Sequence, residues 1–411
     1  MGGVANAAIV DKTGNPAENW DVPMRIALVS EIDINRKIAW SGTHRYMADA
    51  LRSAGAEVEI FDPIWEFQTL TLDNVGKVIR RLGGSDPMLN RSRFIARLKA
   101  GTLQKRVKGA GFDALLAPVG STLISEMPPG IPIIYSSDAT VPLMQDYYGR
   151  FGRAGAAGSA RAFASERSAL QRADLLVYPT WWAANSAIVD FGIDESRILV
   201  QPFGANLSDP PARADALRPR RSGPLRLLFC GVEWERKGGD VALAALADLL
   251  ASGQEAELVI LGCTPPDGAL SDPALARAID VVPFLNKAIP QERQRFRDIF
   301  LDADIFILPT LAECYGLVFC EAAACGAVSF GTATGGVPEV ILDGNTGRVL
   351  PPGATGGDYA KAIRDVVRED GRLQRMKHAA RTDYEERLNW GVWGNAVLQR
   401  ARTLGDPQSR K

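Results

Sequence analysis

The chain has 411 residues, of which 46% are apolar and 23% charged, and its formal net charge is −1. This length and composition are typical of a globular protein with room for two cores, and the charge gives no global attraction to nucleic acid. No apolar run reaches the ~18 residues that span a bilayer, and the N-terminus lacks the pattern of a signal peptide, so we expect neither feature.

The first half of the chain alternates short apolar runs with helical patterns. We expect residues 1–22 to form a loose extension and residues 23–206 to form one domain. Strand–helix alternation with continuously apolar strands predicts a parallel sheet that is covered on both faces. The predicted strands are 25–30, 58–61, 114–117, 131–135, 175–178 and 198–200, with helices such as 46–54 and 160–172 between them.

A proline-rich, charged stretch then interrupts this alternation. Residues 207–224 are predicted to form an interdomain linker, and residues 225–385 a second domain of the same α/β class. An amphipathic helix within 386–411 is expected to cross back to the first domain. The predicted strands of the second domain are 225–230, 257–261, 279–282, 305–308, 327–330 and 348–350, and helices such as 239–251 and 291–300 separate them.

Two carboxylates, Glu313 and Glu321, enclose seven almost entirely apolar residues. The local pattern predicts a buried strand at 304–309, a loop at 310–315 and a helix from Gly316 onward. A buried carboxylate needs a hydrogen-bond donor, which is either a protein group or a ligand hydroxyl. Because free N–H groups at a helix start attract anions, this segment suits a nucleotide sugar. The alternative is a strand–loop–helix unit with one capping Glu and one internal salt bridge.

Arg236 and Lys237 follow the first strand of the second domain and precede a glycine pair, Gly238 and Gly239. Adjacent cations before a helix can stabilise a departing diphosphate, since Arg offers a rigid fork and Lys a compact charge. The alternative is a solvated turn with surface charges.

Three further segments follow predicted strands at the same edges. Gly42, Thr43 and His44 begin a first-domain helix, where they either let a ligand approach the backbone or form a simple Ser/Thr cap. Asp138 either faces a sugar hydroxyl or caps the next helix. Gly335-Gly336, before Pro338, suits a helix start with exposed N–H groups or a tight turn.

Other patterns do not indicate chemistry. Asp302-Ala-Asp304 spells a metal-binding DxD but is read as a helix-to-strand turn, because Asp304 leads into a buried strand. The five cysteines form no CxxC pair and are read as small buried residues in a reducing compartment. Ten cations against one acid between residues 77 and 108 indicate either a solvated helix face or a contact with anionic lipid.

Together, these segments resemble GT-B glycosyltransferases of the retaining GT4 type, the group 1 glycosyltransferases. The most specific element is the E-x7-E pattern of Glu313 and Glu321. The supporting segments are 236–238, 308–310 and 335–339 in the second domain and 41–43, 137–140 and 202–206 in the first. Two positions depart from the pattern: Val232 stands where many members carry Arg, and Asp138 where many carry a His that faces the donor sugar.

The resemblance implies roles for these residues. Glu313 would bind donor-sugar hydroxyls, Glu321 the ribose hydroxyls, and Arg236 and Lys237 the diphosphate. Asp138, in place of the family's His, is counted with Lys237, Arg236 and Glu313 among the candidate catalytic residues. Further substrate contacts are expected at Gly42, Thr43, His44, Phe284, Gly316, Leu317, Val318, Gly335 and Gly336, with Phe284 beside the base.

The resulting expectation is a hexosyl-type, retaining transfer from a nucleoside-diphosphate sugar, UDP or GDP ahead of ADP, to an acceptor hydroxyl, without metal or cofactor. The alternatives are a GT-B sugar-nucleotide epimerase and a non-catalytic two-domain protein that binds nucleotide sugars. We expect a cytoplasmic location, either free or at the inner membrane face through the 77–108 stretch, and no nucleic-acid partner. The residues do not specify the acceptor or the oligomeric state.

Overall fold

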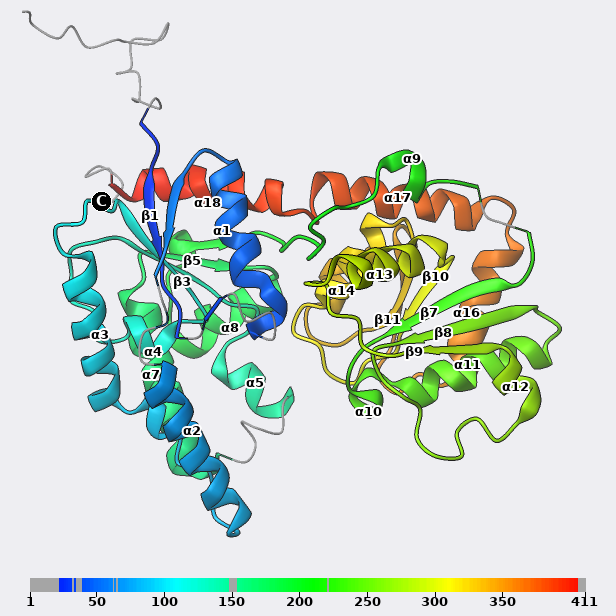
Figure 1. Cartoon of the computed structure of the whole chain (residues 1–411), viewed down its shortest axis with the longest axis horizontal. Helices are drawn as coiled ribbons and strands as arrows, with labels where there is room; N and C mark the ends of the chain where they lie inside the picture. Colours follow the sequence, from blue (N-terminus) through cyan, green and yellow to red (C-terminus); the bar gives the residue numbers. More distant parts are fainter. Residues whose placement is uncertain are drawn as a thin grey trace, which may run out of the picture.

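The structure, a computed structural model, describes residues 22–31, 33–34, 39–61, 63, 66–147, 154–219 and 222–405. The predicted extension therefore lies outside the described residues except for Val22. Within the described residues, two six-stranded parallel sheets lie side by side along the long axis (Figure 1). Each sheet is flanked by helices on both faces, which confirms the predicted α/β class.

The first sheet has the strand order β2-β1-β3-β4-β5-β6, and all of its pairs are parallel. Its strands are β1 (Arg25–Leu28), β2 (Glu57–Ile60), β3 (Ala114–Pro118), β4 (Ile133–Ser136), β5 (Leu175–Tyr178) and β6 (Ile198–Val200). The helices between them are α1 (Thr43–Ser53), α2 (Glu66–Arg81), α3 (Arg93–Val107), α4 (Ser121–Ile124), α5 (Val141–Tyr147), α7 (Gly155–Arg172) and α8 (Trp181–Phe191). Every predicted strand of this half is confirmed to within two residues at either end.

Alternate residues of these strands bury against different helices. Ile26 and Leu28 of β1 pack in one cluster with residues of α1 and of the C-terminal helix α18 (Trp390–Arg402). Ala27 and Val29 belong to a second cluster that contains residues of α3, α4, α7 and α8. This period-two division explains why the strands read as unbroken apolar runs.

The second sheet has the strand order β12-β11-β10-β7-β8-β9, again with parallel pairs. Its strands are β7 (Leu225–Cys230), β8 (Ala256–Leu261), β9 (Ile279–Val282), β10 (Ile305–Leu308), β11 (Val328–Thr332) and β12 (Gly347–Leu350). The helices of this half are α9 (Arg213–Ala216), α10 (Trp234–Lys237), α11 (Gly239–Ala251), α12 (Pro273–Arg277), α13 (Pro290–Asp302), α14 (Leu317–Ala324), α15 (Val337–Val340), α16 (Gly356–Arg368) and α17 (Arg372–Glu386).

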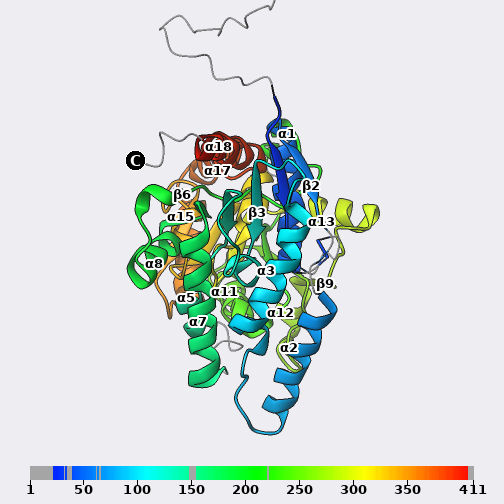
Figure 2. The ribbon, with the colours of Figure 1, turned by 90° about the vertical axis from the view of Figure 1, so that its left-hand side faces the viewer.

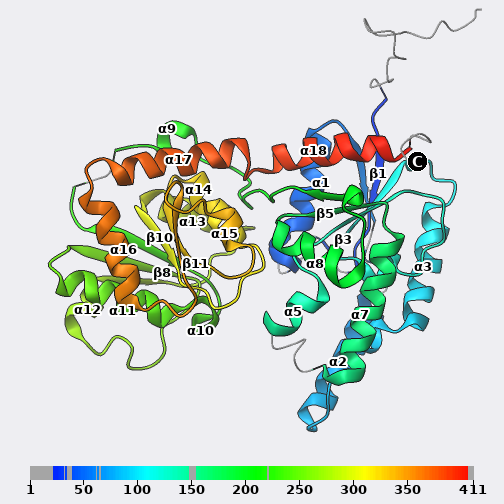
Figure 3. The same ribbon diagram turned by 180° about the vertical axis from the view of Figure 1, so that it is seen from behind.

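The C-terminal helix α18 lies along the first sheet's side of the molecule, beside α1 (Figures 1 and 3). The contact between α18 and α1 is close, since a Cβ added to Gly394 would lie 2.5 Å from the carbonyl oxygen of Ala50. Where the chain crosses between the sheets, the N–H of Ala205 donates to the carbonyl of Leu388 at 3.1 Å. The outgoing and returning crossings are therefore joined by a hydrogen bond.

The basic 77–108 stretch is divided between two helices and does not form one surface helix. It spans the end of α2, a 3-10 turn (Leu89–Arg91) and α3. Lys99 is completely buried, and its Nζ donates to Glu31 at 3.0 Å and to Thr122 at 3.3 Å. The far end of α2 projects beyond the rest of the first domain in all three views (Figures 1, 2 and 3).

Candidate functional site

The candidate site is built on two adjacent strands of the second sheet. β7 and β10 are paired, so the loops that follow them leave the same edge side by side. The N–H of Leu311 donates to the carbonyl of Arg236 at 2.8 Å, and Thr310 Oγ1 donates to the same carbonyl at 3.2 Å. The loop that carries the paired cations is thus fastened to the loop that carries Glu313.

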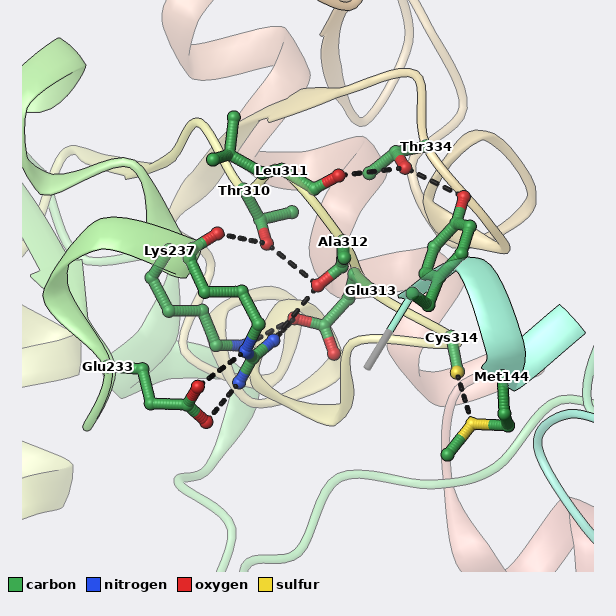
Figure 4. Close-up of polar contacts among 11 residues, drawn as sticks. Met144, Glu233, Lys237, Thr310, Leu311, Ala312, Glu313, Cys314 and Thr334 are labelled. Carbon is green, nitrogen blue, oxygen red and sulfur yellow. Dashed lines mark hydrogen bonds and ion pairs between the residues drawn. The ribbon is translucent and has the colours of Figure 1, made fainter. Parts of the chain in front are cut away.

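Lys237 and Glu313 meet at this edge (Figure 4). Lys237 Nζ forms an ion pair with Glu313 Oε2, and only 11% of each side chain is exposed. Arg236 Nη1 lies 4.0 Å from the same oxygen and donates to the carbonyl of Ala312 at 2.9 Å. Glu233 accepts two further bonds from the Arg236 guanidinium, at 2.9 and 3.0 Å. Both predicted cations and the first predicted glutamate therefore share one half-enclosed cluster.

Helix α14 begins directly beside this cluster. Gly316, the residue before it, has φ +88°, and a Cβ there would lie 2.6 Å from the Phe319 ring and 3.2 Å from Glu313 Cγ. Only glycine accommodates both the left-handed backbone and this close approach. The helix start has no side-chain cap. The N–H groups of its first turn, which include those of Leu317 and Val318, are therefore suited to an anionic ligand.

The second glutamate has a protein partner. Lys287, in the loop after β9, donates from Nζ to Glu321 Oε1 at 2.6 Å and to the carbonyl oxygen of Asn206 at 3.2 Å. Burial raises the pKa of Glu321, and the attraction of Lys287 only partly opposes this rise. The sequence around Glu321 predicted a hydrogen-bond donor for its carboxylate but did not identify Lys287 as that donor. Lys287 could have been proposed as the partner because it is a cation just past the end of a strand at the same edge of the sheet.

Asp138 of the first domain lies close enough to the cluster for the charge of Glu313 to act on its carboxyl. Its Oδ2 accepts a hydrogen bond from Trp40 Nε1 at 3.2 Å. Burial raises the pKa of Asp138 to about 6, and the negative charge of Glu313 adds to the rise. The first N–H of α5, that of Val141, donates to Glu166 and not to Asp138. Sequence reasoning missed Trp40.

Of the other first-domain candidates, Gly42 has open space beside its backbone, whereas the side chains of Thr43 and His44 are buried. Gly42, with φ +79°, precedes α1, and no described atom lies within 4 Å of a Cβ built there. The side chain of Thr43 is buried and accepts from Asn206 Nδ2 at 3.3 Å, while His44 Nε2 lies 3.3 Å from the carbonyl oxygen of Pro118. The alternative of a simple Ser/Thr cap is wrong, since Gly42 is the capping residue and no side chain caps the helix.

The Gly335-Gly336 turn lies where the two domains touch. A Cβ on Gly335 would overlap the carbonyl oxygen of Glu313, and one on Gly336 would lie 2.8 Å from Thr180 of the first domain. Next to it, Tyr147 Oη and Thr334 Oγ1 lie 2.8 Å apart (Figure 4). The two glycines therefore let the Glu313 loop and the first domain pack on the same turn.

Glu339, three residues further on, completes this interdomain contact. Its carboxylate accepts from the backbone N–H groups of Trp181 (2.7 Å) and Trp182 (2.8 Å), at the start of α8 in the first domain. Glu339 belonged to the recognised segment, but its cross-domain partner was not predicted. Two other positions from the sequence analysis lie at the surface. The side chain of Phe284, which was expected beside the base, is 66% exposed, and that of Val232, which departs from the family pattern, is 59% exposed.

A small cavity elsewhere in the second domain is not part of this site. It is lined by residues that include Arg218, Arg226, Asp302 and Asp304 and lies at the amino ends of β7 and β10. Asp302 ends α13 and pairs with Arg218, and Asp304 accepts from the N–H of Arg226 at 3.1 Å. The reading of the DxD pattern as a structural turn is confirmed.

Among the described residues, no group of three or more His, Cys, Asp and Glu side chains is placed to hold a metal ion. No helix in this part of the chain combines the length and apolarity that a bilayer crossing requires. Of the five cysteines, Cys314, Cys320 and Cys325 are buried, as predicted, whereas Cys230 and Cys263 are only partly buried.

A family model described as "Glycosyl transferases group 1" matches residues 217–383, which contain the Lys237–Glu313 cluster, α14 and the Gly335-Gly336 turn. This segment of the chain is thus similar to the group 1 glycosyltransferases. The D-inositol 3-phosphate glycosyltransferase of Rhodococcus jostii is 30% identical over 249 residues, which are 58% of this chain and 54% of that protein. The chain spans little more than half the length of the curated relatives that it matches.

Solved structures show the fold of nearly the whole chain. Sucrose-phosphate synthase from Thermosynechococcus elongatus matches 93% of this chain and 99% of its own, with TM-score 0.64 and 16% identity. Anabaena Alr3699/HepE, in complex with UDP and glucose, matches 92% of this chain and 99% of its own, with TM-score 0.62 and 13% identity. The predicted GT-B fold is confirmed.

Proposed function

We propose that this chain is a retaining glycosyltransferase that moves a sugar from a nucleoside-diphosphate sugar to an acceptor hydroxyl. The observation that carries the proposal is the Lys237–Glu313 pair, with Arg236 beside it and the uncapped start of α14 next to it. Cations and helix N–H groups suit a diphosphate, and the carboxylate suits sugar hydroxyls. All of these groups lie within the matched segment 217–383.

In the reaction, the bond between the sugar's anomeric carbon and the diphosphate oxygen breaks, and a bond from the acceptor oxygen to that carbon forms on the same face. The acceptor's proton passes to the departing diphosphate oxygen. Arg236, Lys237 and the α14 N–H groups stabilise the negative charge that develops on this leaving group. Asp138, across from Glu313, orients the reacting hydroxyls, and no metal ion is required.

The donor and acceptor are proposed by class. UDP-sugars are the first donors to test, because the Anabaena neighbour was solved with UDP. GDP-sugars come next, ahead of ADP-sugars. The relatives are named for D-inositol 3-phosphate, so a phosphorylated cyclitol is the first acceptor to test.

The test has two steps. A thermal-shift panel of UDP-, GDP- and ADP-sugars identifies the donor, since a ligand at 100 times its dissociation constant adds about 2.7 kcal/mol of stability. The selected donor is then incubated with and without acceptors, and the product's anomeric configuration is read by NMR. Retained configuration in an acceptor-dependent product is the expected result. Inversion, sugar interconversion without acceptor as in an epimerase, or tight binding without turnover would each contradict the proposal.

We also propose that the first domain works at an anionic membrane surface on the cytoplasmic side. Helices α2 and α3 and the turn after α2 expose large apolar side chains among cations: Val78 of α2 is 51%, Leu82 of the turn 82% and Phe94 of α3 69% exposed. Arg93 and Arg97, on the same exposed side of α3, are 72% and 61% exposed although both pair with Glu126. Exposed apolar groups among cations are typical of segments that lie on anionic lipid.

Cosedimentation with vesicles tests this contact. We expect binding to vesicles of equal parts phosphatidylcholine and phosphatidylglycerol, weak binding to phosphatidylcholine alone, and loss of binding in the Leu82→Ser/Phe94→Ser variant. Val189→Ser, an exposed position on α8, is the matched control. Equal binding of both variants, or no binding by the wild type, would contradict the proposed contact.

A further inference from the structure

Lys287 connects the donor half of the site to the segment that crosses between the domains. Its ammonium lies 2.6 Å from Glu321 Oε1 and 3.2 Å from the carbonyl oxygen of Asn206. Asn206 is itself buried and held on both sides of its amide, since Nδ2 donates to Thr43 at 3.3 Å and Oδ1 accepts from Trp390 Nε1 at 3.0 Å. The second anchor of Lys287 is therefore a fixed point.

The loop that carries Lys287 is also fixed. The N–H of Asn286 donates to the Glu292 carboxylate at 2.5 Å, and Asn286 Oδ1 accepts from the N–H of Ala288 at 3.0 Å. The Lys287 ammonium also lies 4.8 Å from the centre of the Phe296 ring, a cation–π contact. A lysine that is restrained at the backbone of its loop and at its charged end acts as a preorganised group.

The geometry leaves half of Glu321 available. Lys287 occupies Oε1, and Oε2 can accept from a ligand diol, since each carboxylate oxygen has two lone pairs. An ionised carboxylate binds hydroxyls more strongly than a neutral acid does. Lys287 supplies the positive charge that keeps Glu321 ionised in its buried position.

Given the proposed function, we propose that Lys287 is a positioning residue for donor binding: it keeps Glu321 ionised and presents the second carboxylate oxygen to the ribose hydroxyls. This role belongs neither to the diphosphate cations nor to the reacting centre, because Lys287 acts only through Glu321. It predicts that losing the lysine makes ribose recognition depend on pH.

The direction of that dependence follows from the groups around Glu321. Tyr46, Cys230, Cys320 and Cys325 also interact electrostatically with this carboxylate. All four are neutral near pH 7, because burial raises the pKa of each, so Lys287 is the charge that matters. Burial raises the pKa of Glu321 and Lys287 opposes the rise. Without Lys287 the pKa rises further, and the ionised form is lost as the pH falls toward the acidic side.

The experiment measures the dissociation constants of UDP and of 2′,3′-dideoxy-UDP by calorimetry, from about pH 6 to about pH 8.5, with GDP analogues in their place if the donor panel selects guanine. The readout is the ratio of the two constants, which cancels the titration of the diphosphate. For the wild type we expect a ratio of at least about tenfold, as for a hydrogen bond to a charged group, with little change over this range. For Lys287→Met we expect the ratio to fall toward one at the acidic end and to recover in part at the alkaline end.

Two further variants separate positioning from damage to the fold. Lys287→Arg keeps the charge and should keep the flat profile. Lys287→Met/Glu321→Gln removes the uncompensated buried charge and should give a ratio near one at every pH. A wild-type profile in Lys287→Met would overturn the positioning role while leaving the proposed function intact. A wild-type ratio near one would instead remove the ribose role of Glu321, and the inference with it.

Discussion

Lys237 and Glu313 form an ion pair at the meeting point of two loops that leave adjacent strands, with 11% of each side chain exposed. The pair holds a cation and an anion ready at the same place. A diphosphate can share the cation while the sugar hydroxyls share the carboxylate. The glutamate is thus internally paired, yet its partner is the very cation assigned to the leaving group.

Replacing Lys237 should affect turnover more than folding. We expect Lys237→Ala to lower kcat by at least ~10²-fold, since it removes a preorganised charge from the leaving group. Steady-state kinetics with saturating donor checks this, with Lys361→Ala, an exposed position on α16, as the control. Near-normal turnover in Lys237→Ala would remove the diphosphate role of this residue.

The Asp138 carboxyl should give a pH-dependent contribution to stability. Burial raises its pKa from 3.8 to about 6 in the folded state. Between these values the folded protein keeps a proton that the unfolded chain releases, so the free energy of unfolding falls as the pH rises through this window. The Asp138→Asn variant has no carboxyl at this position, so it lacks this pH-dependent contribution to the free energy of unfolding.

We therefore expect the stability of Asp138→Asn, relative to the wild type, to improve from about pH 4 to about pH 6 and then to remain constant. Urea unfolding across this range measures the difference. Parallel stability curves for the two proteins would show that the Asp138 carboxyl is not perturbed in the folded state.

Removing the Glu339 carboxylate should weaken the contact between the domains. Glu339→Ala leaves the N–H groups of Trp181 and Trp182 without their acceptor. The loss of a helix cap costs about 1–2 kcal/mol of unfolding free energy. Chemical denaturation provides the measurement, with Glu386→Ala, an exposed position on α17, for comparison. The prediction fails if both variants unfold at the same denaturant concentration.

Two glycines with positive φ allow a matched test of packing at the site. Gly335→Ala would bring a Cβ into the carbonyl oxygen of Glu313, whereas Gly344→Ala would meet no described atom within 4 Å. Both variants carry the backbone strain of a left-handed alanine, about 1 kcal/mol. Only Gly335→Ala should also displace the Glu313 loop and lower activity, by at least about tenfold. Equal activity in the two variants would separate this turn from the site.

The strands could be predicted because parallel strands buried on both faces read as continuous apolar runs. The bounds of β5, β7, β9 and β10 agree with the prediction at both ends. Strand–helix alternation then placed the candidate residues at the carboxyl edges, and the E-x7-E pattern located Glu313 and Glu321. These features depend on local order in the sequence.

Long-range partners could not be predicted in this way. Lys287 reaches Glu321 because β9 and β10 belong to one sheet, although 34 residues separate the pair. Lys99 looked like one of many surface cations, but Glu31 and Thr122 compensate its complete burial. The pairing of Trp40 with Asp138 likewise depends on tertiary packing.

The hydrogen bond between Ala205 and Leu388 joins the two chain segments that connect the domains. A single flexible connecting segment would let the two domains twist and slide independently. Two segments joined by a hydrogen bond favour bending about one shared axis. Any opening between the domains is therefore expected to bend near Asn206, whose carbonyl oxygen accepts a hydrogen bond from Lys287. If the proposed function holds, a nucleotide that binds Glu321 would lie beside the point about which the domains rotate.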